Sequence, residues 1–299
     1  MSKLVFYLLI LPLSKVPLWI TYRLSDLLFL IGYYLVGYRK RVVRSNIDRS
    51  FPALSTSEKR KIERDFFRHL CDVIFESIRG FSMSREETIR RFTLKEGHLL
   101  DELANRGKNA IIASGHTGNW EMCAIAMAPQ IRHITKAIYT PLSDKFLEHA
   151  VHENRSRFGM VLIPKNVARQ TEFFPENELS LLVMGTDQSP STRQRPYFME
   201  FLHQDTPVQY GTEYFARKYD LAVLYGAIRK IKRGHYTMTM MKMTDDPNSL
   251  PPGSITEWHT RVLEDLIREN PSIWLWTHKR WKRSRKDYAE FTTAEQLAE

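Results

Sequence analysis

Short, almost wholly apolar runs constrain the fold of this chain of 299 residues more than any other feature. They stand at residues 109–114, 179–184 and 222–228, and polar segments separate them. Runs of this length and continuity are typical of strands that are buried on both faces of a sheet. The pattern therefore predicts a sheet with helices on either side.

Helical periodicity between and around these runs supports an α/β fold. Residues 44–90 repeat apolar side chains at helical spacing, and residues 122–128 and 258–269 predict two further helices. Residues 236–243 alternate threonine with methionine, as an edge strand does, and residues 274–276 predict a last short strand. We expect a single α/β domain with a central mixed sheet that helices flank.

The first 37 residues form a separate apolar segment with only four charged side chains, Lys3, Lys15, Arg23 and Asp26. A membrane-spanning helix needs roughly 20 uninterrupted apolar residues, but prolines and charges break the run here. The segment predicts a membrane-anchoring helical region that inserts shallowly or as one tilted helix. A helix pair buried in a soluble core is the alternative. On a helix, Arg23 and Asp26 are close enough to pair.

A basic run follows this segment at once and would face anionic lipid head groups; its members are Arg39, Lys40, Arg41 and Arg44. The change in composition divides the chain into an anchor at residues 1–37 and a folded domain at residues 38–285. Residues 286–299 are expected to form a charged C-terminal tail.

Lysine and arginine outnumber aspartate and glutamate by 44 to 34, which gives a formal net charge of +10. This excess suits an anionic partner, such as phosphate head groups, an acidic carrier protein or nucleic acid. The basic residues are spread along the chain and form no nucleic-acid-binding motif, so we expect no nucleic-acid partner. Cys71 and Cys123 belong to no Cys/His cluster, and we expect neither a disulfide framework nor a metal site.

Residues 114–121, Ser-Gly-His-Thr-Gly-Asn-Trp-Glu, place a base and an acid where a predicted strand passes into a helix. On one helix, His116 and Glu121 would point about 140° away from each other. They can meet across a turn in which Thr117 or Asn119 caps the helix. A carboxylate on one imidazole nitrogen would leave the other nitrogen free to take a proton from an alcohol. The alternative is a histidine bonded to a backbone group, beside a solvated glutamate.

This stretch resembles the HxxxxD/E motif of the lysophospholipid acyltransferase superfamily. Over nearly its whole length, the chain resembles the branch that contains the lauroyl- and myristoyltransferases of lipid A biosynthesis. The chain departs from that pattern in its apolar anchor, which charged residues interrupt. The segments that carry the resemblance follow one another in the family's order: 46–52 (NIDRSFP), 114–121, 154–159 (NRSRFG), 187–188, 198–207, 211–218 and 274–282 (WLWTHKRWK).

The resemblance implies roles for four residues. By it, His116 is the general base and Glu121 is its orienting partner. Arg155 matches the family's functionally important arginine, and Arg157 is the nearby alternative or a substrate-binding residue. Attack of a hydroxyl on a thioester needs proton removal and a positive group near the developing oxyanion, which these residue types supply. The chain has no GxSxG motif, which favours direct transfer over an acyl-enzyme, and no cofactor is expected.

Four further residues are candidates for substrate binding. Asp187 and Gln188 end a predicted buried strand, where α/β sheets gather ligand-facing residues, or they form a simple turn. His278 and Arg280 alternate with two tryptophans in the predicted last strand. They would bind phosphate or sugar groups of the acceptor, or else form the basic end of an aromatic core edge.

Together these patterns predict an O-acyltransferase at the cytoplasmic face of the inner membrane. It would transfer a fatty acyl chain from an acyl carrier protein thioester to a hydroxyl of a lipid A precursor. The same residues would also serve another acceptor, such as an amino-acid lipid or a lysophospholipid. A non-catalytic basic membrane-binding protein is the alternative outside the enzymes, although such a protein has no need of His116 and Glu121.

Overall fold

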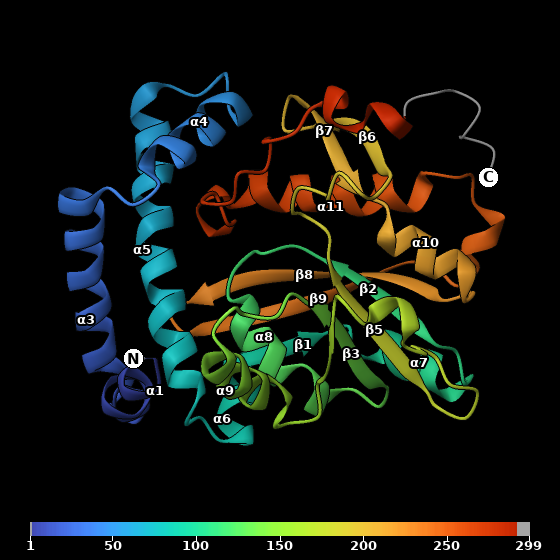
Figure 1. Cartoon of the computed structure of the whole chain (residues 1–299), viewed down its shortest axis with the longest axis horizontal. Helices are drawn as coiled ribbons and strands as arrows, with labels where there is room; N and C mark the ends of the chain where they lie inside the picture. The colour runs from blue at the N-terminus through green and yellow to red at the C-terminus, as the bar shows by residue number, and fades with distance from the viewer. Residues whose placement is uncertain (1, 292–299) are drawn as a thin grey trace.

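The computed structural model describes residues 2–291, apart from the side chains of residues 169, 290 and 291. A seven-stranded sheet lies between two layers of helices, and a group of N-terminal helices stands at one end of the strands (Figure 1). The predicted α/β fold, with a mixed central sheet that helices flank, is confirmed.

The strands of the central sheet are β1 Phe92–Lys95, β2 Ala110–Ser114, β3 Ile134–Tyr139, β4 Val161–Pro164, β5 Ser180–Gly185, β8 Ala222–Lys232 and β9 His235–Thr244. Their order across the sheet is β1-β9-β8-β2-β5-β3-β4. The five strands from β8 to β4 are parallel, whereas β9 folds back on β8 as a hairpin and β1 runs with β9. The prediction of β9 as an edge strand was wrong, because the short strand β1 covers its outer side.

The three predicted buried strands are confirmed as β2, β5 and β8. All five residues of β2, at the centre of the sheet, are buried. Its successive residues Ile111 and Ile112 pack into different hydrophobic clusters, one on each face of the sheet. An unbroken apolar run results because both faces are covered.

Helices on opposite faces of the sheet enclose these strands (Figure 1). The predicted helices near residues 122–128 and 258–269 correspond to α8 and α11. One face carries α6 Arg85–Arg91, α7 His98–Asn105, α8 Trp120–Ala126 and α9 Lys145–Ser156, and the other carries α10 Gly211–Lys218 and α11 Ser254–Glu269. Short 3-10 turns complete the domain at Ala128–Gln130, Ala168–Gln170, Pro247–Ser249 and Pro271–Ile273.

A separate antiparallel hairpin, β6 Pro196–Phe201 and β7 Gln204–Gln209, packs against α11. Its turn consists of Leu202 and His203, which both have positive φ. The hairpin lies outside the central sheet and continues the loop that follows β5 (Figure 1).

The N-terminal part consists of helical segments that Pro17 interrupts. They are α1 Ser2–Val5, η1 Phe6–Ile10, α2 Leu11–Ser14, α3 Leu18–Leu30, η2 Ile31–Val36, α4 Lys40–Ser50 and α5 Thr56–Gly80. Ser55 caps α5 in a reciprocal capping box with Glu58. Within residues 2–291, no helix has both the length and the apolar character that crossing a membrane requires.

One face of the predicted anchor docks on the domain. α3 lies beside α5 (Figure 1) and buries Thr21, Ser25 and Phe29, which are four residues apart and so share a helix face. The predicted pairing of Asp26 with Arg23 was wrong, because Asp26 instead meets Arg233 from the β8–β9 hairpin, at 2.7 Å.

The predicted last strand at residues 274–276 was wrong. Trp274 and Trp276 are both buried, and their rings meet edge to face at 4.6 Å. The backbone of this segment follows the 3-10 turn at Pro271–Ile273 and meets the sheet side only through an isolated bridge between Trp274 and Thr117. Packing of two indoles into the core, and not strand pairing, produces the alternation.

The predicted C-terminal tail lies partly within a folded turn. Residues Arg285–Phe291 form the 3-10 segment η7, in which Tyr288 is buried and donates to Pro190 O over 2.8 Å. The rest of the predicted tail, residues 292–299, lies outside the described residues.

Candidate active site

His116 lies in the turn between β2 and α8, and a carboxylate holds it at two points. Its Nδ1 is 2.6 Å from Asp187 Oδ1, and its backbone N–H donates to Asp187 Oδ2 over 2.9 Å. Asp187 follows β5, which pairs with β2, so both residues stand at the carboxyl ends of adjacent parallel strands. Ligand sites of α/β sheets form at this edge.

Asp187 is buried and its oxygens are fully engaged. Trp274 Nε1 donates to Asp187 Oδ2 over 2.8 Å, beside the backbone N–H of His116. Burial alone would raise the pKa of Asp187, but the charge of His116 and these donors hold that pKa well below its ordinary range. Asp187 is therefore ionised at neutral pH.

The negative charge of Asp187 acts on His116. Burial by itself would lower the pKa of His116, but the Asp187 carboxylate, with a smaller effect from Glu121, raises that pKa above its ordinary value. The hydrogen bond assigns the proton of the neutral ring to Nδ1, so Nε2 keeps its lone pair. Nε2 lies 3.4 Å from the amide nitrogen of Gln188. This is the geometry of a general base with an orienting acid.

Glu121 lies in the first turn of α8, as predicted, and the predicted cap Asn119 is confirmed. Asn119 Oδ1 accepts the backbone N–H of Met122 over 2.8 Å. The predicted contact of Glu121 with the imidazole needs correction, because Asp187 occupies Nδ1 and no hydrogen bond between residues 2 and 291 joins Glu121 to His116. The strand order places β5, and with it Asp187, directly beside His116.

Glu121 instead pairs with Arg155 of α9 in a two-point ion pair. Arg155 Nη2 lies 2.7 Å from Glu121 Oε1, and Arg155 Nε lies 3.0 Å from Glu121 Oε2. Arg155 lines the same pocket as His116. The fork of hydrogen bonds fixes the plane of the guanidinium, and within residues 2–291 no hydrogen bond engages Nη1.

Arg157 points away from this site, so its prediction as a substrate-binding residue needs correction. Its guanidinium donates to Gly80 O over 2.5 Å and to Phe81 O over 3.0 Å at the end of α5. Residues two apart on a helix differ by about 200° in direction, which explains why Arg155 and Arg157 face different surroundings.

Three other side chains that were predicted to bind ligand are not among the residues that line the pocket. Asp187 is buried behind His116 and does not reach the pocket, whereas Gln188 lines it. His278 Nε2 accepts the backbone N–H of Ser189 over 3.1 Å, and burial lowers the pKa of His278 to about 4. Arg280 is almost fully buried, which lowers its pKa to about 10. Neither His278 nor Arg280 is among the residues that line the pocket.

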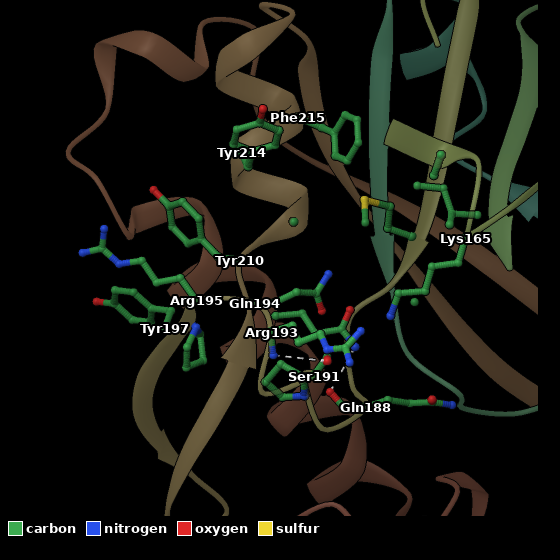
Figure 2. Close-up of a pocket in the computed structure, with 18 of the residues that line it drawn as sticks. Lys165, Gln188, Ser191, Arg193, Gln194, Arg195, Tyr197, Tyr210, Tyr214 and Phe215 are labelled. Carbon is green, nitrogen blue, oxygen red and sulfur yellow. Dashed lines mark hydrogen bonds between the residues drawn. The ribbon is translucent and has the colours of Figure 1, made fainter. Parts of the chain in front are cut away.

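A pocket of about 1870 Å³ opens at His116. Figure 2 shows Lys165 on one side, Tyr197 and Tyr210 on the other, and Arg193 between them. Its apolar lining includes Ile138, Phe173, Met184, Tyr214, Phe215 and Tyr219. Its basic lining comprises Arg155, Lys165, Arg193, Arg195, Arg217, Lys218 and Arg285, and none of the described lining residues is aspartate or glutamate.

The pocket therefore combines positive charge with aromatic surface. Three of its basic side chains are paired with carboxylates: Arg217 with Glu213 at 2.9 Å, Arg155 with Glu121 at 2.7 Å, and Arg285 with Asp205 at 2.7 Å. Between residues 2 and 291, no group of three or more His, Cys, Asp and Glu side chains is arranged to hold a metal ion. The space suits a ligand that is both anionic and apolar.

A sequence model of the bacterial lipid A biosynthesis acyltransferases matches residues 5–283. The chain belongs to this family. A search among curated proteins gives no match. As a lipid A biosynthesis acyltransferase, the chain is a transferase that needs an acyl donor and a lipid acceptor. The match spans the resemblance seen in the sequence, including His116, Glu121, Arg155 and Asp187.

Sequence reasoning missed two features of this acyltransferase site. Asp187 and Trp274 were not predicted as partners of each other or of His116, because their contact depends on strand order. The basic loop with Arg193 and Arg195 was also missed. Its signal was two arginines between prolines in residues 190–196, shortly after β5 and Asp187.

Proposed function

We propose that this acyltransferase moves a fatty acyl chain from an acyl carrier protein thioester to a hydroxyl of a lipid A precursor, with His116 as general base. The observation that supports this most is the position of His116. Its Nδ1 is occupied by Asp187, and its ring borders a large pocket that is basic and aromatic. A hydroxyl and a carbonyl bound in that pocket would be within the reach of Nε2.

In the proposed step, His116 Nε2 removes the proton of the acceptor hydroxyl as the hydroxyl oxygen attacks the thioester carbonyl. Collapse of the tetrahedral intermediate breaks the C–S bond and leaves the new ester C–O bond. The imidazolium then returns the proton to the departing thiolate. Asp187 orients the ring and stabilises the imidazolium that forms in between.

Arg155 is proposed to stabilise the negative oxygen of the intermediate. Its hydrogen bonds to Glu121 use Nε and Nη2, so Nη1 would be available to an oxyanion bound in the pocket that Arg155 lines. A preoriented cation in a partly enclosed site stabilises a developing oxyanion far more than water does. In this proposal Glu121 of the HxxxxE motif acts by holding Arg155.

The basic lining supports the choice of donor and acceptor. Lys165, Arg193 and Arg195 line the pocket, and within residues 2–291 no ion pair with a carboxylate engages them, whereas Arg285 is paired with Asp205. Such residues would bind phosphate groups of a lipid A precursor, and they would complement an acidic carrier protein at the pocket mouth. The aromatic lining would accommodate an acyl chain.

The reaction is proposed to take place at the cytoplasmic face of the inner membrane, with the N-terminal segment as the attachment. Large apolar side chains on its outer surface are exposed, among them Leu8 at 69%, Trp19 at 70% and Leu35 at 80%. The basic run from Arg39 to Arg44 follows them in the chain. An apolar face beside basic residues favours shallow insertion into an anionic bilayer surface.

The test is mass spectrometry of the products that the purified full chain forms from a mixed pool of acyl carrier protein thioesters. A lipid A precursor, an amino-acid lipid and a lysophospholipid are offered together. We expect the lipid A precursor to gain one acyl chain, with loss of product in His116→Ala and normal product in the surface variant His98→Ala. Acylation of another lipid would support the alternative acceptor. An unchanged lipid pool would support the non-catalytic membrane-binding protein.

A further inference from the structure

Three polar side chains form a buried stripe along α5, on the side that faces the turn at Gly118 and Asn119. His69, Asp72 and Glu76 stand three and four residues apart, so they share one face of the helix. They are 4%, 4% and 1% exposed, respectively. Burying ionisable groups is costly unless hydrogen bonds compensate, and none of the three takes part in the proposed chemistry.

Glu76 receives hydrogen bonds from three separate elements. Its Oε2 accepts the side-chain amide of Asn119 over 2.7 Å and the hydroxyl of Tyr236, on β9, over 2.8 Å. Its Oε1 accepts the hydroxyl of Tyr22, on α3, over 3.0 Å. One carboxylate therefore joins the N-terminal helix, the central sheet and the turn that follows β2.

The bond to Asn119 decides how α8 begins. An asparagine amide has one accepting oxygen and one donating nitrogen. Because Glu76 accepts from the nitrogen, the oxygen of Asn119 faces the backbone N–H of Met122, which it caps at 2.8 Å. The first turn of α8, which bears Glu121, is thereby held at a fixed orientation.

His69 holds the residue before this cap. Its Nε2 lies 2.9 Å from Gly118 O. Gly118 has a φ of +56°, and a Cβ there would lie 2.8 Å from Ile228 Cγ2, so the turn has one tight conformation. His116 stands two residues before Gly118, and Glu121 stands two residues after Asn119. The polar stripe of α5 thus hydrogen-bonds to Gly118 and Asn119, in the middle of the segment that joins these two side chains.

The same stripe is tied to α3. Besides the Tyr22 bond to Glu76, Ser25 Oγ donates to Asp72 Oδ1 over 2.8 Å. Arg233 bridges Asp72 at 2.5 Å and Asp26 at 2.7 Å. The outer surface of this helix is apolar and exposed, for example at Leu27, so α3 has a hydrogen-bonded inner face and an apolar outer face.

We propose that Glu76 is a positioning residue for acyl transfer, because it fixes the turn between His116 and Glu121. Through its hydrogen bond with Tyr22, it also makes the conformation of that turn depend on how α3 packs against α5. The inference rests on the proposed function of His116. Displacement of a reacting group by about 1 Å can cost on the order of 100-fold in rate. A loss of the Glu76 bonds should therefore act on turnover more than on substrate saturation.

The experiment compares Glu76→Leu with Glu76→Gln in the full chain on vesicles of anionic phospholipid. Leucine removes all three hydrogen bonds, whereas glutamine keeps an oxygen for Asn119 and Tyr236 and offers its amide to the Tyr22 oxygen. For Glu76→Leu we expect kcat to fall about 10- to 100-fold with KM changed less than about threefold. Glu76→Gln should restore kcat to within about fivefold of the original chain. Rates are taken at a temperature where thermal unfolding shows every variant to be folded.

Tyr22→Phe tests the link to α3, and Tyr34→Phe is its matched control. Tyr22→Phe removes one hydroxyl and should lower kcat about two- to fivefold, the effect of one lost hydrogen bond. Tyr34 is exposed on η2, and its substitution should leave kcat unchanged. If Glu76→Leu does not fold, the kcat values of Tyr22→Phe and Tyr34→Phe are sufficient to test the positioning role of Glu76.

His116→Ala separates the two levels of the proposal. If His116→Ala keeps its activity, the proposed function fails, whatever the Glu76 variants do. If His116→Ala is inactive while folded Glu76→Leu and Tyr22→Phe keep the original kcat, only the positioning role of Glu76 is overturned. A rise in KM with kcat unchanged in these variants would also overturn it, because binding and not the turn would then have been affected.

Discussion

Asp187 binds His116 at both the ring and the main chain, with 2.6 Å from Oδ1 to Nδ1 and 2.9 Å from Oδ2 to the backbone nitrogen. The two residues are 71 positions apart in the chain and meet because β2 and β5 are neighbours. A buried ionised carboxylate thereby sets the tautomer of a histidine that is only partly exposed, at the edge of a basic pocket.

The first prediction is that His116 and Asp187 act as one unit. His116→Ala and Asp187→Asn should each lower turnover by about 10²–10⁴, the usual contribution of a general base. The double variant should be no more than a few-fold slower than the slower single variant, because the second change removes a group whose partner is already lost. Rates of acyl transfer in the three variants measure this. Effects that multiply would argue for independent roles.

The second prediction separates Arg155, in the last turn of α9, from Arg157, which follows the helix. Arg155→Lys should lose about 10-fold or more in turnover, because lysine keeps the charge but cannot form the two-point pair with Glu121. Arg157→Lys should leave turnover close to normal and lower the free energy of unfolding by about 1–3 kcal/mol, since it breaks bonds to two backbone carbonyls. Kinetics and thermal unfolding of both variants are compared. Normal turnover in Arg155→Lys with a collapse in Arg157→Lys would reverse these assignments.

The third prediction concerns the N-terminal segment. Replacing Leu8, Trp19 and Leu35 together by serine should release the folded protein from anionic vesicles, because these side chains are exposed. Ile134→Ser, at an apolar residue of β3 that is 41% exposed, is the control and should leave binding unchanged. Vesicle flotation and circular dichroism follow binding and fold. Full retention of binding in the triple variant would place the attachment elsewhere.

Deletion of residues 2–37 should have a different effect from these substitutions. The inner face of α3 and η2 contributes Phe29 and Tyr33 to a core cluster that includes Phe67. Removal of this face would expose that cluster and take away the hydrogen bond that Tyr22 donates to Glu76. We therefore expect the truncated chain to unfold at a clearly lower temperature, so that only the surface substitutions isolate the attachment.

The fourth prediction tests the tight turn after His116. Gly118→Ala should destabilise the fold and lower turnover about 10-fold or more, because its Cβ would collide with Ile228 and its φ is positive. Gly107→Ala is the matched control: its φ is +63°, but nothing lies within 4 Å of a Cβ there. It should cost about 1–2 kcal/mol of stability through backbone strain alone and leave turnover unchanged. Equal turnover in the two variants would show that the turn tolerates displacement.

The inner strands could be predicted from the sequence because both of their faces are buried. β2, β5 and β8 have unbroken apolar runs for this reason. β3 mixes polar with apolar residues, and β4 is a partly exposed run of only four residues, so the same pattern does not mark them.

In the candidate site too, features that depend on neighbouring residues could be predicted, whereas contacts between distant residues could not. The cap at Asn119 and the place of Glu121 in the first helical turn follow from neighbouring residues, and both could be predicted. The choice between Asp187 and Glu121 as partner of His116 depends on which strand lies next to β2. Periodicity does not specify strand order, so a carboxylate five residues away was favoured over one 71 residues away.

The most direct test is the pH dependence of kcat/KM for acyl transfer in the original chain, Asp187→Asn and Glu121→Gln. A general base works unprotonated, so kcat/KM should rise with pH through the pKa of His116, which its neighbours place above the ordinary 6.5. Asp187→Asn removes the main charge that raises this pKa, so the rising limb should move to lower pH while the maximal rate falls. Glu121→Gln should move the limb less, because its charge has the smaller effect. A larger shift in Glu121→Gln than in Asp187→Asn, or no shift in Asp187→Asn, would contradict an Asp187-supported base at His116.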